Sequence, residues 1–313
     1  MNKSYRAGAA AVIFAVILRI GCSTLPQQAI QFLQKPEVIR LLLFTETGRW
    51  VEFPRYQTGH RAESSVPVFE QGLSFLEEDA QLVNIQNVCG KAVDVAALLQ
   101  QPLQLKLKGS APTVLILHTH GSEAYTDHHV QNYRTLDENH NMLSVGQALA
   151  GQLEQAGIKT VQDRALHDYP SYNGSYTHAR SALKTYLQDN PSIQLVLDLH
   201  RDAAEDDLGN QVAQVCSVNG QEAAKIMLVV GGGHDGWVSN MALALKLQAR
   251  LEQLYPGICR PIAFRAQTFN QDLWGNTLLI EIGSAGNTQQ QALYTAQLLS
   301  QALIDLQNGT TDN

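Results

Sequence analysis

The sequence predicts an α/β protein in which a sheet is layered against helices, and three observations lead to that prediction. After Pro112, apolar runs of strand length alternate with segments of helical spacing. The runs at residues 113–117, 193–199 and 277–282 are rich in aliphatic residues, which is typical of buried strands. Polar motifs stand at the ends of these runs, where α/β sheets bind ligands. Such alternation indicates layered packing.

The other elements follow from local signals. Residues 142–156 have helical spacing and stop at Gly157, a common helix C-terminus. The pair Asn219-Gly220 separates two apolar runs, 212–218 and 224–230, and predicts a hairpin. A further strand is expected at residues 158–161. The remaining helices are expected at residues 177–187, 241–255 and 288–306.

The N-terminus differs from the rest of the chain. Lys3 and Arg6 precede an apolar stretch that Arg19 interrupts, a pattern typical of a signal peptide or signal anchor over residues 1–25. Cys22 after Gly21 offers lipidation as an alternative. We therefore expect the protein in the cell membrane, with its body outside the cytoplasm. The expected domains are a stalk or accessory region at 26–110, a catalytic domain at 111–308 and a tail at 309–313.

Composition excludes some partners. The net charge of −7 and the absence of dense Lys/Arg runs argue against nucleic-acid binding. Cys89, Cys216 and Cys259 form no Cys-x-x-Cys pair, so a thiolate zinc site is not expected. A Cys216–Cys259 disulfide is an alternative to two buried free thiols, which we favour.

The strand ends supply metal-ligand chemistry. His120 and Glu123 have His-x-x-Glu spacing directly after the strand at 113–117, and His200 follows the strand at 193–199. Two His and one Glu leave a fourth zinc position open for water, as hydrolases require. His118 and His120 should point the same way in extended backbone, so either can be the ligand. We favour His120 as the ligand and His118 as a catalytic group.

Further groups complete this hypothesis. Glu281 ends an apolar strand, where desolvation raises the pKa of a carboxylate and suits a general base. Arg201 is a candidate for holding an oxyanion, with a salt bridge to Asp198 or Asp202 as the alternative. Asp198 is placed to orient the His200 imidazole.

An aromatic and polar segment at residues 167–176 suits recognition of a glycan-linked peptide. We expect its Tyr169, Tyr172 and Asn173 to contact substrate, with a packed surface loop as the alternative.

Together these motifs resemble the stage II sporulation protein P family over residues 113–306. The resemblance rests on residues 118–125, Arg134-Thr135-x-Asp137, residues 167–176, residues 198–203 and Asn270-Gln271-Asp272-Leu273 leading to residues 279–283. It implies a zinc-dependent hydrolase with an amidase-like fold, in which a mixed sheet is flanked by helices. The implied zinc-site residues are His120 or His118, Glu123 and His200, and the implied base is Glu281.

The resemblance also implies an activity and partners. The implied reaction is cleavage of the N-acetylmuramoyl-L-alanine amide of peptidoglycan, with stem-peptide cross-links as a further target, at the sporulation septum during engulfment. The implied partners are stage II sporulation proteins D and M. The alternatives are a zinc carboxypeptidase-like or deacylating hydrolase and a non-catalytic cell-wall-binding protein.

Overall fold

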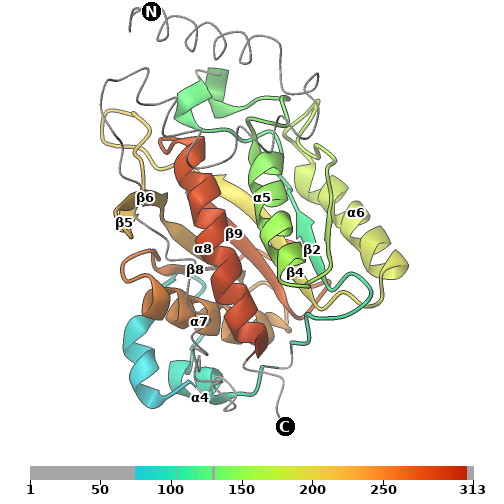
Figure 1. Ribbon diagram of the computed structural model, residues 1–313, viewed down its shortest axis with the longest axis vertical. Coiled ribbons are helices and arrows are strands. Elements are labelled where there is room, and N and C mark those ends of the chain that lie inside the picture. Colours follow the sequence, from blue (N-terminus) through green and yellow to red (C-terminus); the bar gives the residue numbers. More distant parts are fainter. Residues whose placement is uncertain (1–74, 104, 129–130, 309–313) are drawn as a thin grey trace, which may run out of the picture. The chain divides into compact units, whose positions relative to one another are not determined.

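The computed structural model describes residues 75–308, apart from residue 104 and residues 129–130 (Figure 1). The expected N-terminal segment (1–25), most of the accessory region and the tail (309–313) lie outside the described residues. The strands are β1 Ile85–Asn87, β2 Val114–Leu117, β3 Thr160–Gln162, β4 Leu195–Asp202, β5 Val215–Val218, β6 Gln221–Ala224, β7 Ile226–Gly231, β8 Ile262–Arg265 and β9 Thr277–Ser284. The α-helices are α4 Val95–Gln100, α5 Met142–Gln155, α6 Ser175–Asp189, α7 Trp237–Leu254 and α8 Gln289–Asn308. Short 3-10 turns occur at Glu77–Leu82, Thr126–His128 and Gln131–Tyr133.

Seven strands form one mixed sheet in the order β1-β8-β7-β9-β4-β2-β3. Its neighbours are parallel except β7 and β9, which run antiparallel. The prediction of an α/β fold with a mixed sheet flanked by helices is thus confirmed. The sheet splits into two parallel groups that point in opposite directions, so the carboxyl ends of β2, β4 and β9 meet at one edge.

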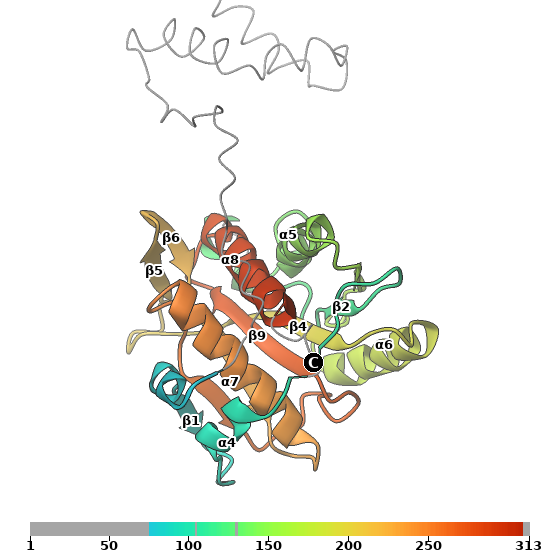
Figure 2. The same cartoon turned by 60° about the horizontal axis from the view of Figure 1, so that its bottom comes forward.

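Alternation along the strands gives the sheet two different faces. On one face, side chains such as Val114 and Ile116 join the large core under α5, α7 and α8, which Figure 2 shows on the same side of the sheet. On the other face, α6 packs through Ala179 and Leu183 against Leu115 of β2 and its neighbours. Helix α6 therefore covers only the β2–β4 half of that second face.

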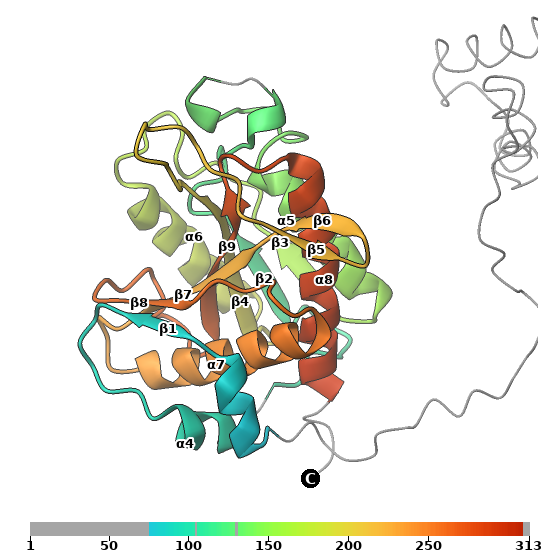
Figure 3. The same cartoon turned by 90° about the vertical axis from the view of Figure 1, so that its left-hand side faces the viewer.

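The rest of the second face carries no helix among the described residues. Met227, Val229, Ala263 and Leu279 form a small separate apolar cluster there, packed against Phe269. Figure 3 shows α7 running beneath β7 and β8, and its packing on these strands belongs to the other face. This half of the sheet is the floor on which the functional site is built.

The predicted hairpin is confirmed, with a shift in its strands. Asn219 and Gly220 both have positive φ, 51° and 78°, as the tight turn requires. The turn joins β5 to β6, and β7 begins only at Ile226 as a strand of the main sheet. Strand β8 was not predicted, because four residues with one charged end give too short an apolar signal.

The expected boundary at residue 110 needs correction, because the described residues between 75 and 107 belong to the same sheet and core. Strand β1 pairs with β8 at the edge of the main sheet. The side chains of Leu98, Leu99, Leu105 and Leu107 are buried in the main core. A chain cut at residue 112 would lose this edge strand and its packing, so experiments need the longer protein.

Lys246 of α7 connects α4 to the rest of the domain through buried hydrogen bonds. Its side chain in α7 is 2% exposed, and Nζ donates to the carbonyl oxygens of Leu98 and Leu99 in the last turn of α4. Those carbonyls have no partner within their own helix, so a cation there is stabilising. Burial lowers the pKa of Lys246 to about 8.

Lys246→Met should therefore lower the free energy of unfolding by about 2 kcal/mol, because it leaves two carbonyls near α4 without their charged donor. Urea denaturation measures the change. Lys184→Met is the matched control, since Lys184 is exposed on α6 and should change stability by less than about 0.5 kcal/mol. Equal midpoints for the two variants would contradict this role of Lys246.

The described residues also show the state of three cysteines and the character of the helices. Cys89, Cys216 and Cys259 are free thiols, so the alternative disulfide is not formed between them. Among residues 75–308, with the gaps given above, no helix combines the length and apolar character needed to cross a bilayer.

Candidate metal centre

Three neighbouring strands deliver the polar residues of the site. Residues 118–123 leave the end of β2, and His200 lies near the end of β4, which is parallel to β2. Glu281 lies in β9 directly opposite His200 in register. The strands β4 and β9 run two to three residues further than predicted, so His200 and Glu281 are held by the sheet itself.

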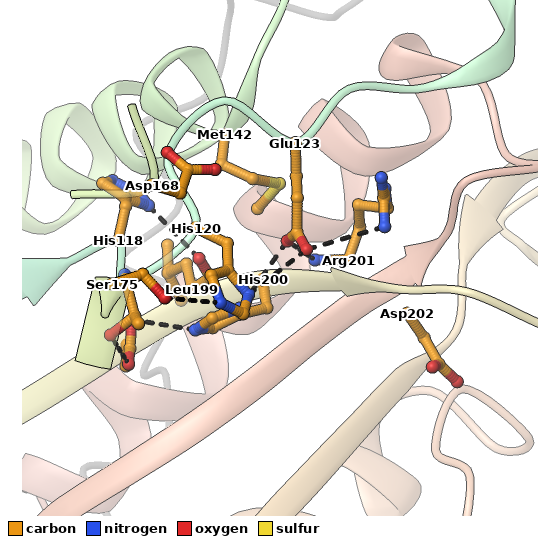
Figure 4. A network of polar contacts seen from close by, with 12 residues as sticks. His118, His120, Glu123, Met142, Asp168, Ser175, Leu199, His200, Arg201 and Asp202 are labelled. Carbon is orange, nitrogen blue, oxygen red and sulfur yellow. Dashed lines mark hydrogen bonds and ion pairs between the residues drawn. The ribbon is translucent and has the colours of Figure 1, made fainter. Parts of the chain in front are cut away.

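His120, Glu123 and His200 form a buried cluster in which one potential ligand atom from each lies within 4.8 Å of the other two. Glu123 lies between the two rings: its Oε1 is 3.5 Å from His120 Nδ1, and its Oε2 is 3.6 Å from His200 Nδ1 (Figure 4). The structure therefore brings together the three residues that the sequence predicts as ligands, with both Nδ1 atoms turned toward the carboxylate.

The outer nitrogens of both rings also lie close to polar side chains. His120 Nε2 is 3.1 Å from Ser175 Oγ at the start of α6, and His200 Nε2 is 3.0 Å from Asp198 Oδ1. Asp198 accepts hydrogen bonds from the backbone N–H and hydroxyl of Thr119. Such contacts fix the ring orientation and leave Nδ1 as the free ligand atom. The predicted orienting role of Asp198 agrees with this position.

The charge on Asp198 is well stabilised. Burial acts to raise its pKa, but the His200 charge and the hydrogen bonds from His200 and Thr119 outweigh it and lower the pKa to about 2. Burial likewise acts to lower the pKa of His200, and the charges of Asp198 and Glu123 raise it well above its usual value. A metal ion must displace that proton from His200 before it can bind.

Asp198→Asn should weaken zinc binding by about 10- to 100-fold, because it removes the anionic acceptor that orients His200. Competition with a fluorescent zinc chelator measures the affinity. Asp163→Asn is a matched control, since Asp163 also pairs with a histidine, His167 at 2.7 Å, outside the cluster. A similar loss of affinity in both variants would contradict a specific role for Asp198.

His118 does not join the cluster. Its Nδ1 is 3.3 Å from the carbonyl oxygen of Leu199, and its Nε2 is 3.0 Å from the amide nitrogen of Gln162. The ring packs on α5 at Gly146, where any Cβ would lie 2.4 Å from Nε2. Burial lowers the pKa of His118 to about 4, so the imidazole is neutral. The expectation that His118 and His120 point the same way is wrong, because the chain turns at Thr119 and strand alternation ends.

Arg201 holds the cluster's carboxylate and its loop. Its backbone N–H donates to Glu123 Oε2 at 3.2 Å, and its Nη1 is 3.6 Å from Oε1. Its other donors bind the carbonyl oxygens of Ala124 and Tyr133. The alternative pairing with Asp202 is not observed, since Asp202 binds Arg260 at 2.6 Å. Two of the three guanidinium nitrogens thus donate to backbone carbonyls and the third faces Glu123, which favours a positioning role. The predicted oxyanion role of Arg201 stays a prediction.

Glu123 is held in the ionised form. Burial acts to raise its pKa, but hydrogen bonds from His120 and His200 and the charge of Arg201 lower it well below the usual value. An ionised carboxylate between two imidazoles is the form that a metal ion requires.

Glu281 is electrostatically different. Burial raises its pKa to about 8, against the lowering effect of the His200 charge. Its Oε2 atom is buried and has no hydrogen-bond partner among the described residues. A half-buried carboxyl group with an unpaired oxygen and a pKa near neutrality has the properties of a general acid–base group.

The three potential ligands open onto one cleft of about 520 Å³, together with Arg201 and Glu281. Tyr172 and Tyr176 line it: the Tyr172 ring lies 4.5 Å from the His120 ring, and Tyr176 meets His120 edge-on at 5.5 Å. Of the predicted substrate contacts, Tyr172 therefore lies at the cleft. Tyr169 and Asn173 are exposed on the same segment but do not line the cleft.

Sequence reasoning did not single out Arg134 as a site residue. Its Nη1 donates to Asp168 at 2.8 Å, its Nη2 is 3.7 Å from Glu123 Oε1, and its guanidinium lies 4.5 Å from the centre of the Tyr172 ring. With 31% of its side chain exposed, it lines the cleft beside the cluster. The signal for it was its place in the motif Arg134-Thr135-x-Asp137.

The motif Asn270-Gln271-Asp272-Leu273 supports the side of the cleft that Tyr176 lines. Asn270 donates to the carbonyl oxygen of Tyr176, and Asp272 binds Arg180 of α6 through both carboxylate oxygens, at 2.7 and 2.6 Å. Gln271 bridges backbone groups of β7. The loop after β8 is thereby fixed to α6, which holds Tyr176 at the cleft.

Fold and site together define a layered α/β protein with a His–Glu–His centre of the kind that suits zinc. The chain belongs to the stage II sporulation protein P family, whose sequence profile matches residues 59–304. It is 26% identical over 201 residues to stage II sporulation protein P of Bacillus subtilis (strain 168), a match that covers 58% of this chain. The chain spans about half, 48%, of that relative's length.

Similar solved structures include two amidases. The chain resembles N-acetylmuramoyl-L-alanine amidase AmiC2 of Nostoc punctiforme with a TM-score of 0.39 and 16% identity, over 64% of this chain and 97% of the other. It resembles the CwlD amidase from Clostridioides difficile, solved in complex with the GerS lipoprotein, with a TM-score of 0.41 and 14% identity, over 63% and 95% of the two chains.

Proposed function

We propose that this protein is a zinc-dependent peptidoglycan hydrolase that cleaves the amide between N-acetylmuramic acid and L-alanine, with stem-peptide cross-links as a further target. Family membership supports peptidoglycan as the substrate. The observation that carries the chemistry is the meeting of three potential ligands and one unpaired carboxyl group, Glu281, at a single cleft.

The donor set fits zinc. His120 and His200 offer Nδ1 and Glu123 offers a carboxylate oxygen, which is the mixed nitrogen and oxygen set that zinc accepts. Magnesium and calcium favour oxygen ligands, so two imidazoles argue against them. Bound there, zinc would acidify a water molecule and polarise the substrate carbonyl.

The residues around the centre have separate roles in proton transfer, in positioning Glu123 and in contacting the substrate. Glu281 accepts a proton from the attacking water and returns it to the leaving amine, for which a pKa near neutrality is suited. Arg201 holds Glu123 in place. Tyr172 and Arg134 border the cleft, where their ring and guanidinium can contact the glycan-linked peptide.

The place of action is also part of the proposal. Lys3 and Arg6 before an apolar stretch support anchoring in the cell membrane with the cleft outside the cytoplasm, at the sporulation septum during engulfment. Stage II sporulation proteins D and M are the proposed partners. Fractionation tests the anchor: the intact chain should sediment with membranes, and a chain starting at Gln27 should not. Equal solubility of the two forms would contradict it.

Digestion of purified sacculi tests the reaction. The intact chain with zinc should release stem peptides with new L-alanine amino termini, identified by mass spectrometry, and a chelator should stop the release. New ends found only within the peptides would instead indicate a carboxypeptidase-like or endopeptidase activity. Binding to sacculi without any new ends would indicate a non-catalytic wall-binding protein.

A further inference from the structure

The cleft extends well beyond the cluster of His120, Glu123 and His200, across the half of the sheet that no described helix covers. From Glu281 it runs over Met227 and Val229 of β7 and reaches Ala263 and Arg265 of β8. The register explains this course, since Glu281 pairs with Met227, and Val229 pairs with Ala263. The floor is apolar, and its far end is marked by one cation.

Arg265 stands on the cleft side of β8 because strand side chains alternate. Ile262 and Phe264 point into the main core, so Ala263 and Arg265 face the opposite side. Arg265 is half-buried, yet its guanidinium has no hydrogen-bond or ion-pair partner among the residues that the structure describes.

The other arginines near the site differ from Arg265 in this respect. Arg134 binds Asp168, Arg201 binds Glu123, and Arg260 binds Asp202. None of the Arg265 side-chain nitrogens is among the buried unpaired atoms of the described residues, so the guanidinium is open to the cleft with its donors free for a ligand. Its planar fork matches a carboxylate, which can accept two parallel hydrogen bonds from it. The geometry thus favours an anionic partner that comes from the substrate.

We propose that Arg265 binds a carboxylate of the stem peptide and so sets which peptides are cleaved. This inference rests on the proposed peptidoglycan substrate. The peptide part of the substrate would lie over Met227, Val229 and Ala263, with its scissile amide at the cluster and a carboxylate at Arg265.

The strand register gives the distance from Glu281 to Arg265, and that distance indicates which carboxylate of the stem peptide reaches Arg265. Arg265 pairs with Gly231, so it lies two strands and four residues from Glu281, roughly 10 Å across the sheet and roughly 13 Å along it. The two Cα atoms are therefore roughly 16 Å apart, and the arginine side chain shortens the gap. An extended arginine side chain spans about 6 Å, which leaves about 10 Å; at about 3.4 Å per extended residue, the carboxylate belongs to about the third residue from the scissile amide.

The test compares soluble muramyl peptides that differ in one group: the carboxylates free, the second residue's carboxylate amidated, or the third residue's carboxylate amidated. For the intact wild-type chain with zinc, amidation at the third residue should lower kcat/KM by about 10- to 100-fold, the effect of losing a charged hydrogen bond. Arg265→Gln should lower kcat/KM on the free substrate by a similar factor and show no further loss on that amide. Arg265→Lys should recover part of the rate.

Arg250→Gln is the matched control, because it removes the same charge from α7, where Arg250 binds Asp305 away from the cleft. It should leave the discrimination unchanged. Discrimination at the second residue instead of the third would keep Arg265 as the carboxylate site and correct the register. Equal losses by Arg265→Gln on free and amidated substrates would overturn the proposal.

A binding measurement separates this inference from the proposed reaction. Calorimetric titration of Glu281→Gln with the same three peptides reports affinity without turnover. If wild-type chain hydrolyses none of them, the proposed function fails, while weaker binding of the amidated peptide in this background would still support the Arg265 site. Equal affinity for all three peptides would overturn it.

Discussion

Glu281→Gln should leave zinc bound and the fold intact while slowing amide hydrolysis by about 100- to 10,000-fold. The amide keeps the size of the side chain but cannot accept the proton from water. Glu281 lies in β9 beside His200 but outside the cluster of three potential ligands, so its loss should not empty the centre. Single-turnover release of stem peptides and zinc content by mass spectrometry measure the two effects.

The interpretation of this variant depends on both readouts. Loss of zinc would make Glu281 a ligand, which would contradict its assignment as a general base outside the three-residue cluster. Near-normal turnover with zinc bound would require another proton acceptor. Glu222→Gln is a suitable control, since Glu222 is exposed on the β5–β6 hairpin and should leave turnover unchanged.

The same substitution has an expected effect on stability. In the metal-free protein, burial raises the pKa of Glu281 from 4.5 to about 8, so the folded state disfavours its ionised form. Wild-type stability should therefore fall as pH rises from about 4.5 to about 8, a loss that Glu281→Gln avoids. At pH 9 the metal-free variant should melt a few degrees higher than wild type, and near pH 4 the two should agree. A lower melting temperature for the variant at pH 9 would contradict the assignment.

Substitution of any cluster residue should remove zinc and activity together. His120→Ala, Glu123→Ala and His200→Ala each delete one of three ligands, so zinc affinity should fall by more than the roughly 10- to 100-fold expected for an orienting residue. Titration with zinc, followed by chelator competition, measures the loss.

His118→Ala is the discriminating comparison. His118 is a buried histidine two residues from His120, but it faces α5 and Gln162. Its removal should lower the urea midpoint and leave about one zinc per chain. Zinc loss in His118→Ala, with zinc retained in His120→Ala, would reverse the assignment.

The parts of the fold that the sequence predicted are those with strong local signals. Strands β2, β4 and β9 are long or fully buried runs. The polar motifs at their ends allowed His120, Glu123, His200 and Glu281 to be predicted as site residues. The antiparallel direction of β7 carries no local signal, because it depends on which neighbour the strand meets. Strand β1 is three residues long at a sheet edge, so its membership of the domain was missed.

The parts of the site that were missed depend on contacts distant in sequence. Arg134 is placed by Asp168, which is 34 residues away, and by the ring of Tyr172. The orientation of His118 depends on Gly146 of α5, which leaves room for the ring on that side of the sheet. Neither contact can be read from residue spacing, since each exists only after the helices pack on the sheet.

The central claim is that His120, Glu123 and His200 hold one zinc ion through both Nδ1 atoms and a carboxylate oxygen. Crystals of the protein with zinc, measured on both sides of the zinc absorption edge, test this claim directly. The expected result is one anomalous peak about 2.0–2.2 Å from these three atoms, with Glu281 outside ligand distance. A peak bound by His118, by the Nε2 atoms or by Glu281, or no peak at this cluster, would contradict it.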